Sequence, residues 1–406
     1  MRKVIFLVDM NAFFISCERT RHAELRGRPA AVAGDPQRRT GIILAANYEA
    51  RAFGVKTTML VHEALRLCPD LALVPPDHDF YAQKSHEVMQ LLRQFTPVVE
   101  PNSIDEAWLD MTGCEKLSGT PLEAAQSIMQ TINEKLDLWC SIGISDNKFL
   151  AKMASEMKKP QGITELWPEN VPGKLWPLPV GAMYGVGQKT AEKLKRLGVA
   201  TIGDLARLSQ EFLVERFGKS GIVLFRHAHG LEDAPVLATD DDTVQSIGRS
   251  TTLSENISDL EKAKRILLEL SDEVAATARK QDLKGQVVQI TLKYTDFKVI
   301  TRQSMVPATN LSQEVYLSGC TLLARNWDSS KPVRLIGISL GHFQKQQEDR
   351  QLTLFDQIDG NKENKALEHV PQTGKVDQAV DYIRERFGQN SITRASLMKK
   401  KKPKDD

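Results

Sequence analysis

The chain has 406 residues, more than a single hydrophobic core usually supports, so we expect at least two domains. Its 41% hydrophobic and 26% charged residues are typical of globular proteins, and no run of about 18 apolar residues predicts a membrane span. Five scattered cysteines with no C-x-x-C pair argue against a disulfide framework or a zinc cluster, and the net charge of +2 excludes little by itself.

The first 77 residues predict a strand, a helix and a small αβ insertion. Residues 3–10, KVIFLVDM, form a short apolar run that ends in an acid, as in a buried strand. Asp9 comes too soon for the apolar core of a signal peptide, and the scattered, odd-numbered cysteines favour a reducing compartment. A helix is predicted at 12–22, and the insertion spans 24–77 with a short strand at 71–76.

Strands and helices continue to alternate as far as about residue 167. The pattern predicts helices at 79–95, 121–138 and 147–159, the last stopped by Pro160, and a strand at 140–146. A hairpin is expected between the first two of these helices, with its turn around Asn102 and Ser103.

This hairpin contains two adjacent acids, Asp105 and Glu106, beside residues that require burial. They are either solvated turn residues or ligands of a divalent cation, because burying an unpaired carboxylate is costly and Mg²⁺ prefers oxygen ligands. Asp9 ends the first strand, and the hairpin could pair beside it. Three carboxylates at neighbouring strand ends is an arrangement that holds two Mg²⁺ ions for in-line phosphoryl displacement.

Residues 183–209 indicate a helix-hairpin-helix. Gly185 and Gly187 precede a helix, and a second turn lies at Gly198. Such glycines let the backbone approach a phosphate, and a helix N-terminus supplies amide donors. The helix is basic, which favours sequence-independent binding of a nucleic-acid backbone over a simple tight turn; its cations are Lys189, Lys193, Lys195 and Arg196.

After an acidic segment at 231–243, the chain predicts a second α+β module. A strand at 246–253, a helix at 257–282, a hairpin, a helix at 311–325 and a strand at 332–343 give the order β-α-β-β-α-β of ferredoxin-like folds. Basic side chains on its strands either follow a duplex backbone or face solvent: Arg249, Lys293, Lys298, Arg302 and Arg334.

The remaining tail is polar and ends in lysines, but it contains two apolar features. The peptide QLTLF, residues 351–355, places Leu352, Leu354 and Phe355 in polar surroundings, as in a docking peptide. A helix is predicted at 376–388 with one apolar face, which we expect to pack on the body or on a partner; this face consists of Val376, Ala379, Val380, Ile383 and Phe387.

Four ordered blocks resemble the signature blocks of Y-family, DinB-type translesion DNA polymerases: FLVDMNAFFISCE (6–18), AANYEARAFGVK (45–56), SIDEAWLD (103–110) and GISDNKFLAKMASEMKKPQGI (143–163). The resemblance implies an α+β multidomain, right-hand polymerase fold. It consists of a ferredoxin-like palm (1–23 and 78–167), small fingers (24–77), a helical thumb (168–230), a linker (231–243), a ferredoxin-like little finger (244–344) and a tail (345–406).

The resemblance also implies an activity, namely a template-directed, low-fidelity DNA polymerase that adds deoxynucleotides to a primer 3′ end in translesion synthesis and DNA repair. Asp9, Asp105 and Glu106 would be its catalytic residues. With the backbone carbonyl of Met10 they would bind two Mg²⁺ ions. Asn11, where many relatives have an acid, is not assigned to metal.

The nucleotide would contact a further set of residues. Phe14 matches the steric gate that excludes a ribose 2′-hydroxyl. The residues grouped at the triphosphate are Phe13, Tyr48, Arg51 and Lys159, with core packing as the alternative for Phe13. The expected DNA contacts are Gly185, Gly187, Lys189, Arg249, Lys293, Arg302 and Arg334.

The resemblance extends to partners. Gln351, Leu352, Leu354 and Phe355 closely resemble a peptide that binds the bacterial sliding clamp. We expect a monomer in the cytoplasm, associated with the nucleoid, that uses primer-template DNA and deoxynucleotides. Two other hypotheses remain: a two-metal nuclease with the same carboxylates, and a non-catalytic DNA-binding factor that recruits the clamp.

Overall fold

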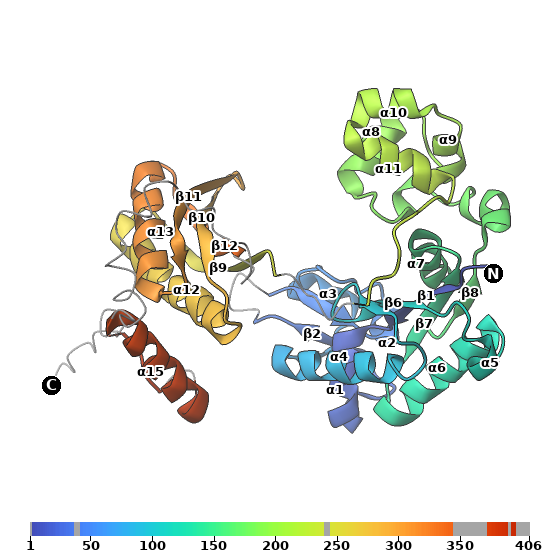
Figure 1. Cartoon of the computed structure of the whole chain (residues 1–406), viewed down its shortest axis with the longest axis horizontal. Coiled ribbons are helices and arrows are strands. Elements are labelled where there is room, and N and C mark those ends of the chain that lie inside the picture. Colours follow the sequence, from blue (N-terminus) through green and yellow to red (C-terminus); the bar gives the residue numbers. More distant parts are fainter. Residues whose placement is uncertain (1, 36–40, 239–243, 344–371, 389–390, 395–406) are drawn as a thin grey trace, which may run out of the picture. The chain divides into compact units, whose positions relative to one another are not determined.

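The computed structural model describes residues 2–35, 41–238, 244–343, 372–388 and 391–394. The chain forms two compact units, Met1–Asp241 and Asp242–Asp406, and both mix helices and strands, so the predicted α+β class is confirmed (Figure 1). The peptide QLTLF and the terminal lysines lie outside the described residues.

A five-stranded sheet forms the centre of the first unit. Its order is β5 (Val99–Pro101), β6 (Glu106–Asp110), β1 (Ile5–Met10), β7 (Cys140–Ser145) and β8 (Ile163–Glu165). The central strand β1 runs antiparallel to both neighbours, and all six of its residues are buried. A strand buried on both faces needs cover on both, which explains why its sequence is a continuous apolar run.

Alternate residues of β1 contact different cores. Phe6 and Val8 pack into the larger core with the helices below the sheet in Figure 1: α1 (Phe13–Arg21), α4 (His78–Leu92) and α6 (Pro121–Leu136). Ile5 and Leu7 face the other side, where α7 (Lys148–Met157) lies. Since side chains alternate along a strand, Asp9 shares the α7 side with Leu7.

The insertion at 24–77 carries its own small sheet. Its order is β3 (Ile43–Ala46), β2 (Ala30–Ala33) and β4 (Ala72–Val74), accompanied by α2 (Tyr48–Ala52) and α3 (Val61–Leu67). Alanines supply much of the core of this insertion, so the core buries little apolar area.

Four helices follow a series of short turns in the rest of the first unit: α8 (Gln188–Arg196), α9 (Ile202–Ala206), α10 (Gln210–Phe217) and α11 (Lys219–Ala228). Gly198 joins the first two with a φ of +83°, and Gly185 has a φ of +85°. Only glycine adopts this region freely, which accounts for both turns. Leu194, Leu205 and Leu213 help to form their common core.

The second unit has the predicted order β-α-β-β-α-β. Its elements are β9 (Ser246–Ile257), α12 (Leu260–Lys280), β10 (Gly285–Tyr294), β11 (Val299–Thr309), α13 (Ser312–Asn326) and β12 (Val333–Phe343). The strands lie in the order β11-β10-β12-β9, and every pair is antiparallel. Helix α12 begins at Leu260 rather than at the predicted residue 257, because Asp259 provides its N-cap.

A C-terminal helix, α15 (Gln372–Phe387), attaches to this unit through charged side chains. Arg279 of α12 pairs with Asp377 at 3.3 Å and with Asp381 at 2.6 Å, and Arg384 of α15 pairs with Asp272 at 2.7 Å. The predicted apolar face is only partly covered, since Val380 and Ile383 in its middle are half-buried while Val376 and Phe387 at its two ends are 60% and 68% exposed. Ion pairs and part of the apolar face thus both contribute to the docked side of the helix.

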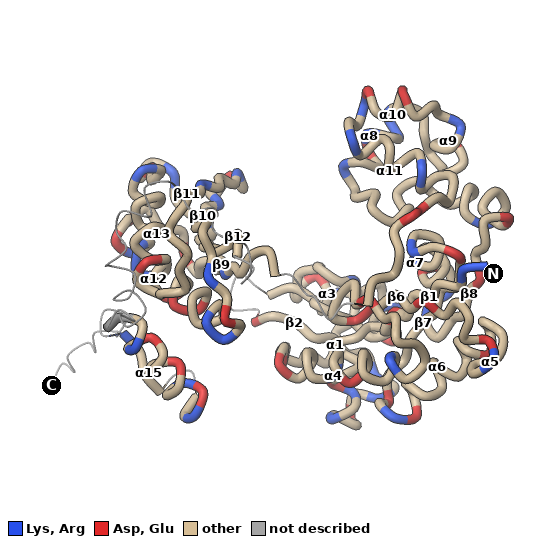
Figure 2. Tube along the Cα trace, in the orientation of Figure 1, with Lys and Arg blue, Asp and Glu red and all other residues tan. Residues whose placement is uncertain are grey.

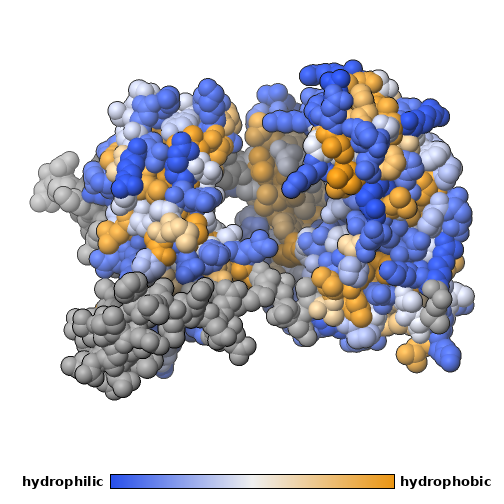
Figure 3. Space-filling model, turned by 45° about the horizontal axis from the view of Figure 1, so that its top comes forward, coloured by the Kyte–Doolittle hydropathy of each residue, from blue (hydrophilic) through white to orange (hydrophobic). Residues whose placement is uncertain are grey.

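Among the described residues, no helix is long and apolar enough to cross a membrane. On the face of the molecule in Figure 3, hydrophilic residues lie between the hydrophobic ones. Several large apolar side chains nevertheless stay exposed, including Leu117 and Met305, which are 91% and 70% exposed.

Candidate active site

The site is centred on two carboxylates of neighbouring strands. The antiparallel register of β1 and β6 pairs Asp9 with Glu106, as it pairs Leu7 with Trp108. Directly paired residues lie on the same face of a sheet, so both carboxylates face α7. Asp9 is 7% exposed and the Glu106 side chain 12% exposed. Two acids this deeply buried require partners.

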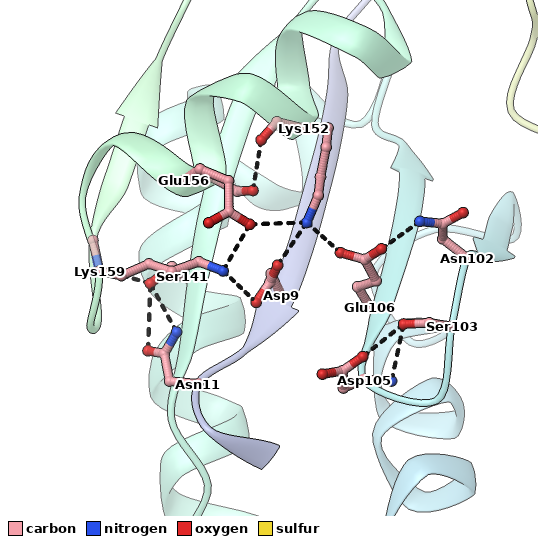
Figure 4. A network of polar contacts seen from close by, with 12 residues as sticks. Asp9, Asn11, Asn102, Ser103, Asp105, Glu106, Ser141, Lys152, Glu156 and Lys159 are labelled. Carbon is pink, nitrogen blue, oxygen red and sulfur yellow. Dashed lines mark hydrogen bonds and ion pairs between the residues drawn. The ribbon is translucent and has the colours of Figure 1, made fainter. Parts of the chain in front are cut away.

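Helix α7 provides those partners. It packs closely on β7 at Gly143, where there is no side chain. A Cβ at Gly143 would come within 2.0 Å of the Ala151 carbonyl oxygen. The Lys152 ammonium nitrogen lies 2.9 Å from Asp9 Oδ2, 2.5 Å from Glu106 Oε2 and 3.0 Å from Glu156 Oε1 (Figure 4). Lys159 reaches Asp9 Oδ1 at 2.8 Å and Glu156 Oε1 at 2.9 Å. Each carboxylate oxygen of Asp9 therefore accepts a hydrogen bond from a different lysine.

These contacts shift the pKa values of the cluster. Burial acts to raise the pKa of Asp9, but the ammonium groups of Lys159 and Lys152 lower it below its usual value. Burial raises the pKa of Glu106, against the effect of Lys152. Burial acts to lower the pKa of Lys152, yet Asp9 and Glu106 raise it above its usual value. Lys152 is thus charged throughout the physiological range.

The Asp105 carboxylate does not join this cluster. It accepts a hydrogen bond from the Ser103 hydroxyl at 2.6 Å and lies apart from the Lys152 nitrogen in Figure 4. Its backbone is close by, because the Met10 amide donates to the Asp105 carbonyl oxygen at 2.9 Å. Within the part of the chain that is described, no three His, Cys, Asp or Glu side chains form a group that could hold a metal ion.

The donor set still fits a hard divalent cation. Asp9 and Glu106 direct oxygens at a common point, where the Lys152 nitrogen acts as a stand-in cation, and Asp105 is adjacent to Glu106 in the chain. Mg²⁺ commonly binds one or two carboxylates and completes its shell with water and substrate phosphates, so a protein cage of three side chains is not required.

Asn11 has a structural role next to the site. Its side-chain amide donates to the Ser141 hydroxyl at 3.1 Å, and its oxygen accepts from the Gln161 amide at 2.9 Å. Both groups of the side chain are therefore occupied, in keeping with its omission from the expected metal ligands.

Phe14 is held by a stack of aromatic and charged groups. Its ring lies parallel to that of Tyr81, with centroids 4.4 Å apart. The Tyr81 hydroxyl donates to Glu18 at 2.6 Å, and the fully buried Glu18 pairs with Arg21 at 2.8 Å. Phe13, only 3% exposed, packs in the main core.

Tyr48 has a buried hydroxyl without a hydrogen-bond partner among the described residues. Burial raises its pKa. The guanidinium of Arg51 lies 4.9 Å from the Tyr48 ring centre and donates through Nε to the Ala46 carbonyl oxygen at 2.9 Å. Buried polar groups normally have partners, so the free hydroxyl is consistent with a ligand oxygen at this position.

The expected DNA contacts lie in several places. Gly187 is the N-cap of α8, and Lys189 lies in its first turn. Figure 2 shows further basic residues along α8 and on the strands of the second unit.

Of the five basic residues expected on the strands, Lys298 lies between β10 and β11, and the other four do not share one sheet face. The row Arg249–Ile338–Ile290–Arg302 lies on the helix-covered face, because both isoleucines are buried in the core there. Accordingly Arg249 pairs with Glu273 of α12, and Arg302 bonds Asn326 of α13.

The other two strand cations share an exposed aromatic ring. The Lys293 nitrogen lies 4.8 Å and the Arg334 guanidinium 5.3 Å from the ring centre of Phe297, which is 61% exposed.

Sequence reasoning missed Lys152, Glu156, Tyr81 and Glu18. A signal for the first two was present, since Lys152, Glu156 and Lys159 follow the i, i+4, i+7 spacing of one helix face. Nothing local connects Tyr81 to Phe14. Gln351–Phe355, which are predicted to bind the sliding clamp, lie outside the described residues.

Comparisons with known proteins cover nearly the whole chain. Models of the impB/mucB/samB family, its HHH motif and its C-terminal domain match residues 8–156, 168–199 and 244–354. Proteins named DNA polymerase IV from Clostridium kluyveri and Alkaliphilus oremlandii are 53% and 52% identical, over 99% and 98% of this chain and 100% of their own lengths. A solved chimeric Y-family DNA polymerase matches with a TM-score of 0.73 and 26% identity, over 84% of this chain and 99% of its own.

Proposed function

This chain belongs to the impB/mucB/samB family of Y-family DNA polymerases, and from that premise we propose which of its residues carry out DNA synthesis. The predicted family and polymerase fold are confirmed. The protein is a DNA-directed DNA polymerase of translesion synthesis, which uses primer-template DNA and deoxynucleotides and depends on a divalent metal.

We propose that Asp9, Asp105 and Glu106, with the Met10 carbonyl, bind two Mg²⁺ ions. The observation that carries this proposal is the register pairing of Asp9 with Glu106 around a buried cation. When bound, such ions activate the attacking 3′-hydroxyl and neutralise charge on the transferred phosphate. Asp105, a half-buried side chain of the hairpin, would take part after it leaves the Ser103 hydroxyl.

The nucleotide contacts follow from the surroundings of these carboxylates. We propose that Tyr48, Arg51 and Lys159 bind triphosphate oxygens, which the free Tyr48 hydroxyl supports. Lys159 already reaches Asp9, so its ammonium group is within one side-chain movement of the site. Phe14, held by Tyr81, would lie against the sugar and exclude a 2′-hydroxyl. Phe13 is buried and contributes by packing beside this ring.

We also propose the division of the chain into palm (1–23 and 78–167), fingers (24–77), thumb (168–230) and little finger (244–344). The separate sheets and helical cores support it. Further proposals are a monomer in the cytoplasm near the nucleoid, DNA contacts through the α8 N-terminus and Lys293 and Arg334, and clamp binding through Gln351–Phe355. Arg249 and Arg302 would reach DNA only at the sheet edges.

Primer extension tests the site directly. With Mg²⁺ and one deoxynucleotide at a time, the protein should add templated nucleotides without shortening the primer. Glu106→Gln should lower the rate at least 10²-fold, as expected when a group acting on transition-state charge is lost. Primer-template affinity should stay within twofold. The control is Glu134→Gln, an exposed residue of α6 on the other side of the sheet. Full activity of Glu106→Gln would refute the assignment, and metal-dependent primer shortening would favour a nuclease.

A further inference from the structure

Lys152 has no part in the functions proposed above, yet its ammonium group occupies the centre of the site (Figure 4). The residue is 9% exposed and contacts three carboxylates within 3.0 Å. We propose that Lys152 is a positioning residue, a built-in cation that keeps Asp9 and Glu106 together before metal binds and yields them to the metal. This inference rests on the proposed metal site at these two carboxylates.

The contacts of Lys152 account for all of its hydrogen-bonding capacity. An ammonium group has three donors, and they serve Asp9, Glu106 and Glu156. Without it, two carboxylates that are about nine-tenths buried would face each other across one strand pair, where repulsion is weakly screened. Lys152 thus performs in the metal-free protein the charge compensation that a divalent ion performs in the loaded one.

The other carboxylate oxygens of the pair also have partners. Lys159 holds Asp9 Oδ1, and the Asn102 amide donates to Glu106 Oε1. A divalent cation bridging the two residues would therefore take the oxygens that Lys152 holds. A divalent ion at Asp9 Oδ2 and Glu106 Oε2 would lie in the space that the Lys152 nitrogen fills, so the two cations compete for this position.

Glu156 provides an alternative partner for the released lysine. It lies one turn along α7 from Lys152, and its side chain is 48% exposed, so it can follow the moving ammonium group. It also bonds Lys159, which lets one carboxylate draw both lysines away from Asp9. Glu156 is a counter-charge for the lysines in this arrangement and does not ligate the metal.

The expected effect is a change in metal affinity in the absence of DNA and nucleotide. Lys152→Met removes a competing charge and should tighten Mn²⁺ binding at least fivefold, whereas Glu156→Gln confines the lysines to Asp9 and should weaken it about threefold. The matched control is Lys158→Met, which removes the same charge from an exposed neighbour without a contact to Asp9 or Glu106. Free Mn²⁺, measured by electron paramagnetic resonance during titration of the full chain, gives each affinity.

The variants in this titration distinguish an error in the proposed metal site from an error in the proposed role of Lys152. If Glu106→Gln binds Mn²⁺ as the wild type does, the proposed metal site itself is wrong. If Glu106→Gln loses binding while Lys152→Met matches Lys158→Met, the site stands and the role of Lys152 is refuted. Should Lys152→Met not fold, Glu156→Gln decides alone, because unchanged or tighter Mn²⁺ binding in that variant contradicts the competition.

Discussion

Asp9 illustrates how much at the residue scale depends on an opposing charge. It is almost completely buried, and two lysines from the segment that follows β7 compensate it. A buried charge that loses its partner is strongly destabilising, so the two lysines are part of the structure as well as of the site. Asp105 and Glu106 could be selected from the sequence, because an Asp-Glu pair in a hairpin is locally conspicuous. The cation that compensates the charge of Glu106 is Lys152, which lies 46 residues further along the chain.

Phe14 gives the sharpest prediction for a single residue. Phe14→Ala removes the ring that lies on Tyr81 and that we propose as the obstacle to a ribose 2′-hydroxyl. The ratio of ribonucleotide to deoxynucleotide incorporation efficiency should rise roughly tenfold to hundredfold. Single-nucleotide kinetics with both sugars measures this ratio, which is insensitive to a general loss of folded enzyme.

A suitable control for Phe14 is Phe53→Ala, since Phe53 is 54% exposed in the same unit. Its sugar selectivity should equal that of the wild type. If Phe14→Ala also retains the wild-type ratio, another side chain excludes the 2′-hydroxyl.

At the scale of elements, α15 is attached by ion pairs in addition to part of the apolar face expected from its sequence. Besides the arginine pairs, Asp377 accepts a hydrogen bond from the Ser312 amide at 2.9 Å. Leu311, the N-cap of α13, has no side-chain oxygen, so Asp377 satisfies an amide at the start of that helix from another element. The docked α15 thus supplies a capping group for the N-terminus of α13.

Removing the central cation should release this helix. Arg279→Met leaves the half-buried Asp381 without its arginine partner and the buried Asp377 with only Arg394, which costs about 3–5 kcal/mol if the helix stays docked. We therefore expect α15 to detach, and hydrogen exchange followed by mass spectrometry should show lost protection in 372–388 with α12 largely unchanged.

Lys280→Met is the control for this experiment, because Lys280 is the exposed neighbour of Arg279 on the same helix. It should exchange like the wild type. Equal protection of α15 in Arg279→Met would mean that the charge pairs do not hold the helix.

At the scale of the whole molecule, we propose that the tail helps the polymerase stay at the primer end. A peptide that binds a ring on the DNA raises the effective concentration of the polymerase at the primer, which matters most for an enzyme with a weak grip. The peptide 351–355 is proposed to provide this tether.

The tether is tested by replacing Leu354 and Phe355 with alanine. Affinity for the bacterial sliding clamp, measured by surface plasmon resonance, should fall roughly tenfold or more, because apolar anchors carry most of the energy of such small interfaces. The stimulation of primer extension by the clamp should fall in parallel. Leu367→Ala changes another apolar residue of the tail and should leave both values unchanged. Undiminished clamp affinity in the double variant would refute the docking peptide.

The sequence by itself determined the elements and the chemical identity of the candidate site. Strand β1, helix α6 and the β-α-β-β-α-β order have local periodicity and capping signals, so their existence could be predicted to within a few residues. The carboxylates Asp9, Asp105 and Glu106 were predicted from their places at strand ends and from the family resemblance. The structure brings Asp9 and Glu106 together, and the role of all three as metal ligands stays a prediction.

Only the tertiary structure decided which side chains meet. The contacts of Lys152, the stack of Tyr81 on Phe14, and the position of Arg249 and Arg302 on the helix-covered face each depend on strand register or on packing between distant segments. The docking of α15 depends in part on a buried arginine on another helix. Local patterns encode periodicity, whereas partners of buried charges are set by nonlocal geometry, which no single segment contains.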